Sequence, residues 1–374
     1  MSINGRPVIY FVESNQNGCN FYRIKQPAFI MLEKDIFPCA SSSILKGGEH
    51  ELYLEKADII VSQGVMSDKF LEYMVEEKGR KKFILDYDDN IFAVSPYNPS
   101  YEKHGYREVD FVLPDGQLIQ VRDGKDGFNI EENKKRLQLF RLCMSQADLV
   151  TTPSAVLSGV FKSLNKNVKV IKNFLDFRIW KPLNLIKDEW VRIGWQGGWS
   201  HYPDFAEIQP VLEEVMAKHP NTRLVIMGTD FPGLMKNLPR DRIDLEMWTG
   251  METYPWKFKT LNIDIGLAPI VNNEFNTCKS EIKWEEYSSL GIPSCASDIP
   301  PYNLAIRDGK TGFLCSNTQE WVDRLSELIS NIDLRRKMGQ DALTYVREHY
   351  DIEKGVEQYR TAYNSLYSKE LILA

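Results

Sequence analysis

The chain has 374 residues, of which 43% are hydrophobic and 26% charged, and its formal net charge is −6. This length is enough for two α/β domains that each have a core, and the composition is typical of a globular protein. The acidic balance disfavours a nucleic-acid-binding protein, although short basic strips occur at 80–82 and 134–136.

The cysteines and the apolar runs indicate the compartment. The six cysteines have no regular spacing, which favours a reducing compartment over a disulfide framework or a structural zinc site. No apolar run approaches the ~20 residues of a membrane span, and the first predicted strand begins too early to leave room for a signal peptide. We therefore expect a cytoplasmic protein with, at most, a peripheral membrane contact.

Short apolar runs alternate with helical patterns, which indicates parallel βαβ units. In the first half we predict strands at 8–12, 59–62, 83–85, 149–152 and 168–171, and helices near 22–32, 68–77, 131–145 and 155–164. Residues 95–129 form an insertion in which Pro114, Asp115 and Gly116 are typical of a hairpin turn. The insertion is either a place for substrate recognition or a surface decoration.

The second half begins after a predicted linker at 181–190. Its predicted strands start at 192, 223, 245, 263 and 294, and its last helices cover 318–331, 334–348 and 352–368. The fold class is therefore α/β, with Rossmann-like domains at 1–180 and 181–350 and a C-terminal helix within 351–374.

A loop and the start of a helix follow the first predicted strand. Gly18 allows the backbone to approach a phosphate closely, and Arg23 offers a bidentate fork for an oxyanion. A plain strand-to-helix turn with a surface arginine is the alternative. Asp86, Asp88 and Asp89 follow a later strand, where carboxyl ends line the cleft of a parallel sheet, so at least one of them is expected to face a ligand. An Asx turn or helix cap is the competing role.

The first strand of the second domain is followed by Gly197, Gly198, Trp199 and His201. Two glycines before a helix form a phosphate cradle. His201 then supplies positive charge to the cradle or is a surface residue at the start of the helix.

The segment 276–293 carries the strongest pattern in the chain. We predict that Lys279, Lys283 and Glu286 lie on one face of a helix. Lysines in the first turns of a helix oppose its dipole, which indicates that they are kept for an anion. A sugar-nucleotide diphosphate fits that description.

The same segment resembles a known signature. The run from Lys283 and Glu286 through Gly291 and Pro293 to Asp298 is similar to the nucleotide-sugar motif of retaining glycosyltransferases with the GT-B fold, especially family 4 and its relatives. The resemblance implies two Rossmann-like domains that face a central cleft, a donor held mainly by the second domain, and a last helix that crosses back to the first. It also implies that Glu286 holds the ribose of the donor.

One position departs from that motif. The first Glu of the family pattern, which contacts the transferred sugar, falls on Cys278. Lys279, Glu281 or the backbone at Asn276 then takes over the contact, or the sugar is held differently.

The resemblance implies transfer of a sugar from a nucleotide donor, expected to be a UDP-sugar, to an acceptor hydroxyl with retention of configuration. We expect no cofactor and no metal, and the acceptor stays open among a glycan, a protein and a modified DNA base. The expected catalytic residues are Asp88, Asp89 and Lys279, and the expected donor-binding residues are Gly18, Arg23, Gly197, Gly198, Trp199, His201, Tyr254, Asn276, Lys279, Ser280, Lys283 and Glu286.

Two other enzyme classes remain as alternatives. Asp86 and Asp88 satisfy the D-x-D pattern with which GT-A glycosyltransferases bind a divalent metal. A nucleotide-sugar epimerase with the GT-B fold shares the two-domain architecture.

Overall fold

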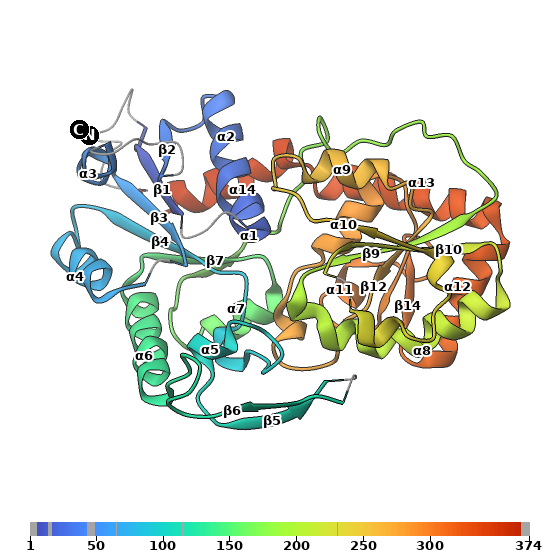
Figure 1. Cartoon of the computed structure of the whole chain (residues 1–374). Coiled ribbons are helices and arrows are strands. Elements are labelled where there is room, and N and C mark those ends of the chain that lie inside the picture. The colour runs from blue at the N-terminus through green and yellow to red at the C-terminus, as the bar shows by residue number, and fades with distance from the viewer. Residues whose placement is uncertain are drawn as a thin grey trace.

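The computed structural model describes residues 6–13, 17–42, 49–64, 66–113, 116–229 and 231–367. Two lobes lie side by side, and each is built on a six-stranded parallel sheet with helices on both faces (Figure 1). Parallel strands buried on both faces have almost continuous apolar sequences, which is the pattern seen here. None of the described helices is long and apolar enough to cross a membrane.

The first sheet has the strand order β2-β1-β3-β4-β7-β8. Its strands are β1 (Ile9–Glu13), β2 (Cys39–Ser41), β3 (Ile59–Gln63), β4 (Lys82–Asp86), β7 (Leu149–Thr152) and β8 (Val168–Val170). One face packs against α2 (Gln26–Glu33) and α14 (Ile352–Asn364), so the last helix of the chain completes the core of the first lobe. The other face is covered by α4 (Asp68–Glu76), α6 (Ile130–Gln146) and α7 (Ala155–Phe161).

The second sheet has the strand order β11-β10-β9-β12-β13-β14. Its strands are β9 (Val191–Gly197), β10 (Thr222–Gly228), β11 (Ile243–Glu246), β12 (Ile265–Ala268), β13 (Ser294–Ser297) and β14 (Phe313–Cys315). The remaining helices are α1 (Gly18–Asn20), α3 (Glu49–Lys56), α5 (Tyr101–His104), α8 (Tyr202–Lys218), α9 (Tyr254–Thr260), α10 (Ile282–Ser289), α11 (Tyr302–Ala305), α12 (Thr318–Ser330) and α13 (Ile332–His349).

Both sheets have a topological switch point, where the strand order reverses. It lies between β1 and β3 in the first sheet and between β9 and β12 in the second. Ligands of open α/β sheets bind in the crevice outside the carboxyl ends of the strands at this point. The loops after β1, β9 and β12 are therefore the places to examine for a site.

The insertion contains an antiparallel hairpin of β5 (Val109–Val112) and β6 (Leu118–Val121), as predicted. Pro114 and Asp115 lie outside the described residues, and Gly116 has a φ of +90°, which favours glycine. Tyr97 and Leu113 pack against the core of the second lobe. The insertion thus belongs to the first lobe by sequence but contacts both lobes.

Several predicted bounds are wrong. The helix of the signature starts at Ile282, so Lys279 lies in the preceding loop and not on the helix face. Strand β11 covers Ile243–Glu246, while the predicted strand began at 245 and ran to 248. Strands β2 and β14 and helix α3 were not predicted. The domain boundaries at 180 and 350 stay predictions.

Candidate active site

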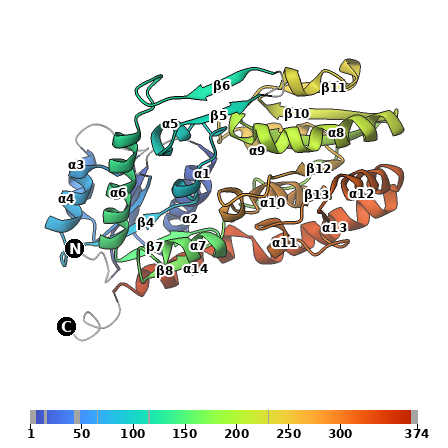
Figure 2. The same ribbon diagram turned by 90° about the horizontal axis from the view of Figure 1, so that it is seen from below.

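The loops at the two switch points face each other where the lobes meet. Figures 1 and 2 both show α10 at this junction, beside α1 of the first lobe. The contact is direct, because the hydroxyl of Tyr22, which follows α1, donates to Glu286 of α10 at 2.7 Å. Gly18 of α1 faces Met251, in the loop before α9 of the second lobe. A site built here draws residues from both lobes.

Strand β9 ends at Gly197, and the loop after it begins with Gly198. A Cβ on Gly197 would lie 2.7 Å from ring carbons of Trp195, so only glycine fits this turn. His201 follows in the turn before α8, and its Nδ1 donates to Asp204 at 2.7 Å. Burial, together with the charges of Lys283 and Lys279, lowers the pKa of His201 to about 3. The imidazole is therefore neutral in the empty site, and its contact with Asp204 is a hydrogen bond without a full positive charge.

Asp204 connects this turn to the loop after β12. Its Oδ1 accepts from the backbone N–H of Val271 at 2.8 Å and from Nδ2 of Asn276 at 3.1 Å. Asn276 Nδ2 also donates to the carbonyl of Val271 at 2.9 Å. The buried amide of Asn276 therefore holds the loop in place, and its contact with the donor stays a prediction.

Lys283 points into the same region from α10. Only 9% of the residue is exposed, yet its Nζ has no hydrogen-bond partner among the described residues. The ammonium lies 5.2 Å from the centre of the Trp195 ring. Burial lowers the pKa of Lys283 to about 7. An unpaired buried cation costs folding free energy, so its presence points to an anionic ligand.

Glu286, in contrast, has several partners. Its Oε1 accepts from Tyr22, and its Oε2 accepts from Tyr254 at 2.6 Å and from Gln196 Nε2 at 3.2 Å. Burial raises the pKa of Glu286, although these three hydrogen bonds act in the opposite direction. The buried hydroxyl of Tyr254 therefore orients Glu286, and the contact of Tyr254 with the donor stays a prediction.

Two carboxylates of the first lobe, Asp88 and Asp89, follow β4 near Lys279 and Cys19. Burial, and then the neighbouring charge of Asp89, raises the pKa of Asp88 to about 7. Burial also raises the pKa of Asp89, against the charges of Lys279 and His104. Asp88 can therefore hold or release a proton near neutral pH, which suits a site that handles hydroxyl groups.

Arg23 does not lie free in the cleft. Its Nε and Nη2 donate to the two oxygens of Asp86 at 3.0 and 2.6 Å, and its Nη1 donates to the carbonyl of Ile171 and to Asn173. We correct the prediction that Arg23 binds the diphosphate, because its donors are occupied and 1% of the residue is exposed. Thr151 donates to the same carboxylate at 2.6 Å.

The engagement of Asp86 also weakens the D-x-D interpretation. A metal at Asp86 and Asp88 would have to displace a buried arginine. Among the described residues, no three or more His, Cys, Asp or Glu side chains are grouped so that they could hold a metal ion.

Other predicted residues lie around this centre. Trp199 is 45% exposed and stacks on Tyr202, with ring centroids 5.5 Å apart. The hydroxyl of Ser280 accepts from Asn173 of the first lobe at 2.8 Å. Cys278, at the position of the missing Glu, points into the core of the first lobe beside Phe275. Gly18, Gly198, Trp199 and Lys279 stay predicted ligand contacts.

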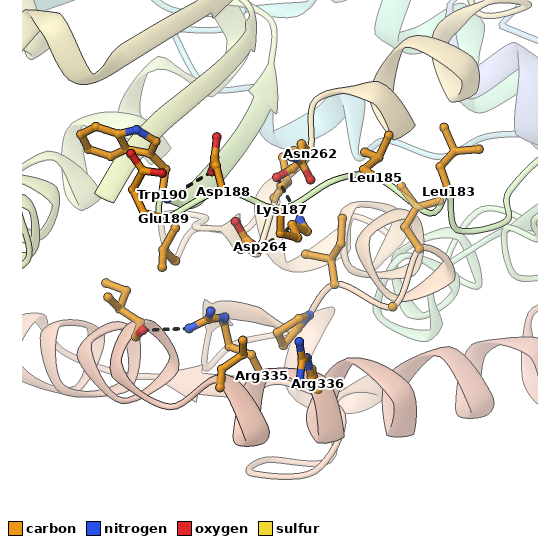
Figure 3. A pocket seen from close by; sticks show the side chains of 18 of the residues that line it. Leu183, Leu185, Lys187, Asp188, Glu189, Trp190, Asn262, Asp264, Arg335 and Arg336 are labelled. Carbon is orange, nitrogen blue, oxygen red and sulfur yellow. Dashed lines mark hydrogen bonds and ion pairs between the residues drawn. The ribbon is translucent and has the colours of Figure 1, made fainter. Parts of the chain in front are cut away.

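A cavity of about 530 Å³ lies elsewhere, at the amino ends of β9, β12 and β13 (Figure 3). It lies between the linker, with Leu183 and Trp190, and the side chains of Arg335 and Arg336 on α13. Because Gly197 is the last residue of β9 and His201 follows it, this cavity is at the opposite edge of the sheet. It therefore lies away from the buried charged groups of Lys283 and Asp88, which are near the junction of the lobes.

Sequence reasoning missed Tyr22, Gln196 and Asp204. Asp204 had a usable signal, because it stands three residues after His201 at the start of a helix, where the two side chains can meet. Tyr22 and Gln196 had none, since their contacts with Glu286 join residues 264 and 90 positions apart.

No known protein-family model matches the chain. The N-acetyl-alpha-D-glucosaminyl L-malate synthase of Bacillus anthracis is 25% identical over 266 residues, which are 66% of this chain and 67% of that protein.

Solved structures show the fold. The sucrose-phosphate synthase of Thermosynechococcus elongatus matches with a TM-score of 0.64 at 12% identity, over 97% of this chain and 100% of that one. Anabaena Alr3699/HepE, solved with UDP and glucose, matches with a TM-score of 0.61 at 13% identity, over 96% and 100%. The predicted GT-B fold, with two Rossmann-like domains, is confirmed.

Proposed function

We propose that this chain, a glycosyltransferase of the GT-B type, moves a sugar from a UDP-sugar to an acceptor hydroxyl with retention of configuration. One observation carries the proposal: the ammonium of Lys283 is buried without a hydrogen-bond partner among the described residues, beside the glycine turn after β9 and at the switch point of the second sheet. A UDP donor is supported by the similarity to a protein solved with UDP and glucose.

The diphosphate would lie against Lys283, Lys279 and His201. Lys279 is half-buried in the loop after β12, and its charge acts on both Lys283 and His201. The glycine turn would let the phosphate approach the start of α8, where backbone N–H groups favour anions. The two lysines supply the positive charge that a diphosphate leaving group requires, because the imidazole of His201 is neutral in the empty site.

The ribose would be held by Glu286. An ionised carboxylate offers about four acceptor positions, and Tyr22, Tyr254 and Gln196 occupy three of them. One position remains for a ribose hydroxyl. Since Tyr22 belongs to the first lobe, the geometry of this ribose contact depends on how the lobes are placed, and closure of the lobes would complete the site.

Stabilising the leaving diphosphate would be the main catalytic task. Negative charge builds on it as the bond to the sugar breaks, and fixed cations in a dry site stabilise that charge. Asp88 and Asp89, beside Lys279 on the facing lobe, are proposed to contact the transferred sugar or the acceptor hydroxyl. Lys279 lies near both Asp89 and His201. It would therefore act between the leaving diphosphate and the carboxylates that are proposed to contact the sugar or the acceptor.

Measuring nucleotide release from a panel of UDP-, GDP- and ADP-sugars tests the proposal. UDP-sugars should be turned over in preference, and addition of the acceptor should increase the release. Conversion of the sugar without an acceptor would indicate the epimerase alternative instead.

Glu286→Ala should raise the donor KM or abolish transfer while the protein stays folded. Glu246→Ala is the matched control, because this carboxylate pairs on the surface with Lys257 at 3.2 Å. Unchanged donor KM and transfer rate in Glu286→Ala would contradict the proposal that Glu286 holds the ribose.

A further inference from the structure

The cations of the proposed diphosphate site face anions that are already engaged. Around Lys283 lie Asp204 of α8, Glu286 of α10, Lys279 of the loop after β12 and His201 of the turn before α8. Asp204 accepts three hydrogen bonds, from His201, Val271 and Asn276, and Glu286 also accepts three. Neither carboxylate accepts a hydrogen bond from Lys283.

We propose that the donor site takes up a proton from solvent when it binds the diphosphate, and that Lys283 is the group that receives it. The inference rests on the proposed function, because it assumes that the nucleotide diphosphate binds at this cluster. The geometry that supports it is a nearly buried amine with no hydrogen-bond partner among the described residues, packed on the Trp195 ring between two other basic side chains.

The charge state of the empty site agrees with this geometry. Burial lowers the pKa of Lys283 to about 7, with Lys279 acting in the same direction and Asp204 and Glu286 in the opposite one. Above neutral pH, the amine of Lys283 is therefore mostly neutral until an anion arrives. A diphosphate within contact distance favours the charged form and raises this pKa.

The sign of the effect follows by linkage. If the diphosphate raises the pKa of Lys283, protonation of Lys283 must strengthen diphosphate binding by the same factor. Below pH 7 the amine is already protonated, so donor affinity does not depend on it. Above pH 7 affinity should fall by about tenfold per pH unit, until the pKa of the bound state is reached.

Calorimetric titration with UDP at pH 8, in buffers that differ in heat of ionisation, measures the uptake. The slope of binding heat against buffer heat gives the number of protons taken up. With a pKa of about 7 in the empty site and a fully protonated amine in the complex, uptake approaches about 0.9 proton per UDP. At this pH the terminal phosphate of UDP, with a pKa of about 6, is already ionised and does not contribute.

Two substitutions of Lys283 assign the proton. In Lys283→Arg the side chain is always charged, so UDP should bind without uptake and with a flat pH dependence. In Lys283→Met binding should weaken and uptake should vanish. Lys257→Met is the control for loss of a lysine: this lysine pairs with Glu246 on the surface, and both affinity and uptake should match the unchanged protein.

The outcomes separate this inference from the proposed function. UDP binding with the same heat in every buffer would overturn the proton uptake and leave the function standing. Uptake that persists in Lys283→Arg would also overturn the proposal, because another group would then receive the proton. Absence of UDP binding would overturn the proposed function itself. The slope for the unchanged protein decides the first point even if neither variant folds.

Discussion

Two buried cations lie near the junction of the lobes and differ in one respect. The guanidinium of Arg23 donates hydrogen bonds to Asp86, to the carbonyl of Ile171 and to the side-chain amide of Asn173. Lys283 is nearly as buried but has no hydrogen-bond partner among the described residues. The sequence made both candidates for the same diphosphate. Burial of a positive charge therefore does not by itself indicate a ligand site. A buried positive charge that has no hydrogen-bond partner does.

The largest effect is expected from the substitution of Arg23, the buried cation whose hydrogen-bond donors are occupied. Arg23→Met leaves the carboxylate of Asp86 buried without its cation, and we expect a loss of about 3–5 kcal/mol in the free energy of unfolding. Urea denaturation measures the change. Replacing both partners, as Arg23→Met with Asp86→Leu, should recover part of the loss. A cost below ~1 kcal/mol for the single change would show that the pair does not hold the first lobe together.

Removal of Lys283, the cation without a hydrogen-bond partner, should weaken ligand binding and leave folding stability unchanged. Lys283→Met should weaken UDP binding by about 1–3 kcal/mol, the size of a charge-assisted hydrogen bond to an anion, without loss of folding stability. The same titration applied to a Lys279 variant tests the second cation. Unchanged UDP affinity in both variants would contradict the assignment of this cluster to the diphosphate.

The stability of the empty protein should also depend on Lys283. Its pKa is about 7 when folded and near the ordinary 10.5 when unfolded. Between these values the unfolded chain binds more protons, so the contribution of Lys283 to stability rises with pH across this window. Denaturation curves at pH 7 and pH 9 should show the rise, and Lys283→Met should lack it. An equal pH dependence in both proteins would contradict the lowered pKa.

A smaller effect is expected from the contact that joins the lobes. Tyr22→Phe removes one hydrogen bond to Glu286 and should cost about 0.5–1.5 kcal/mol in donor binding, seen as a higher KM with little change in kcat. Tyr359→Phe is the matched control, because the buried hydroxyl of Tyr359 has no hydrogen-bond partner among the described residues. Equal donor KM values in the two variants would contradict a role for Tyr22 in donor binding.

No effect is expected from removal of divalent metals. Fixed cations are proposed to do the electrostatic work that Mg²⁺ or Mn²⁺ does in GT-A enzymes, so transfer should continue in excess EDTA. The measurement is nucleotide release with and without the chelator. Activity that is lost to EDTA and restored by Mn²⁺ would favour the GT-A alternative.

The alternation of strands and helices was predictable because each buried parallel strand is a short apolar run. Prediction failed at three of the four edge strands, β2, β11 and β14, which have only three or four residues each. Strand β2 has three residues, and Met247 and Trp248 resemble strand residues but follow β11 as exposed side chains. Helix α3 has no buried residue, so its sequence has no apolar stripe from which a helix could be predicted.

At the site, the positions of the loops were predictable and the partners were not. Parallel topology alone places Gly197, Asp88 and Lys279 at carboxyl edges of the sheets. The pairing of Arg23 with Asp86, or of Asn276 with Asp204, joins residues 63 and 72 positions apart. No local pattern in the sequence encodes which of these polar groups satisfies the other, and that choice decides which residues remain available to a ligand.

The loop after β12 has a further consequence for how the chain can be divided. Phe275 and Cys278, from the second half of the sequence, are buried in the core of the first lobe, and α14 packs on its sheet. A fragment cut at residue 180 would lack both, leaving an apolar hollow on one face and an uncovered sheet on the other. The core of the first lobe is thus completed by segments from the second half of the sequence, and a cut at residue 180 separates that core from them.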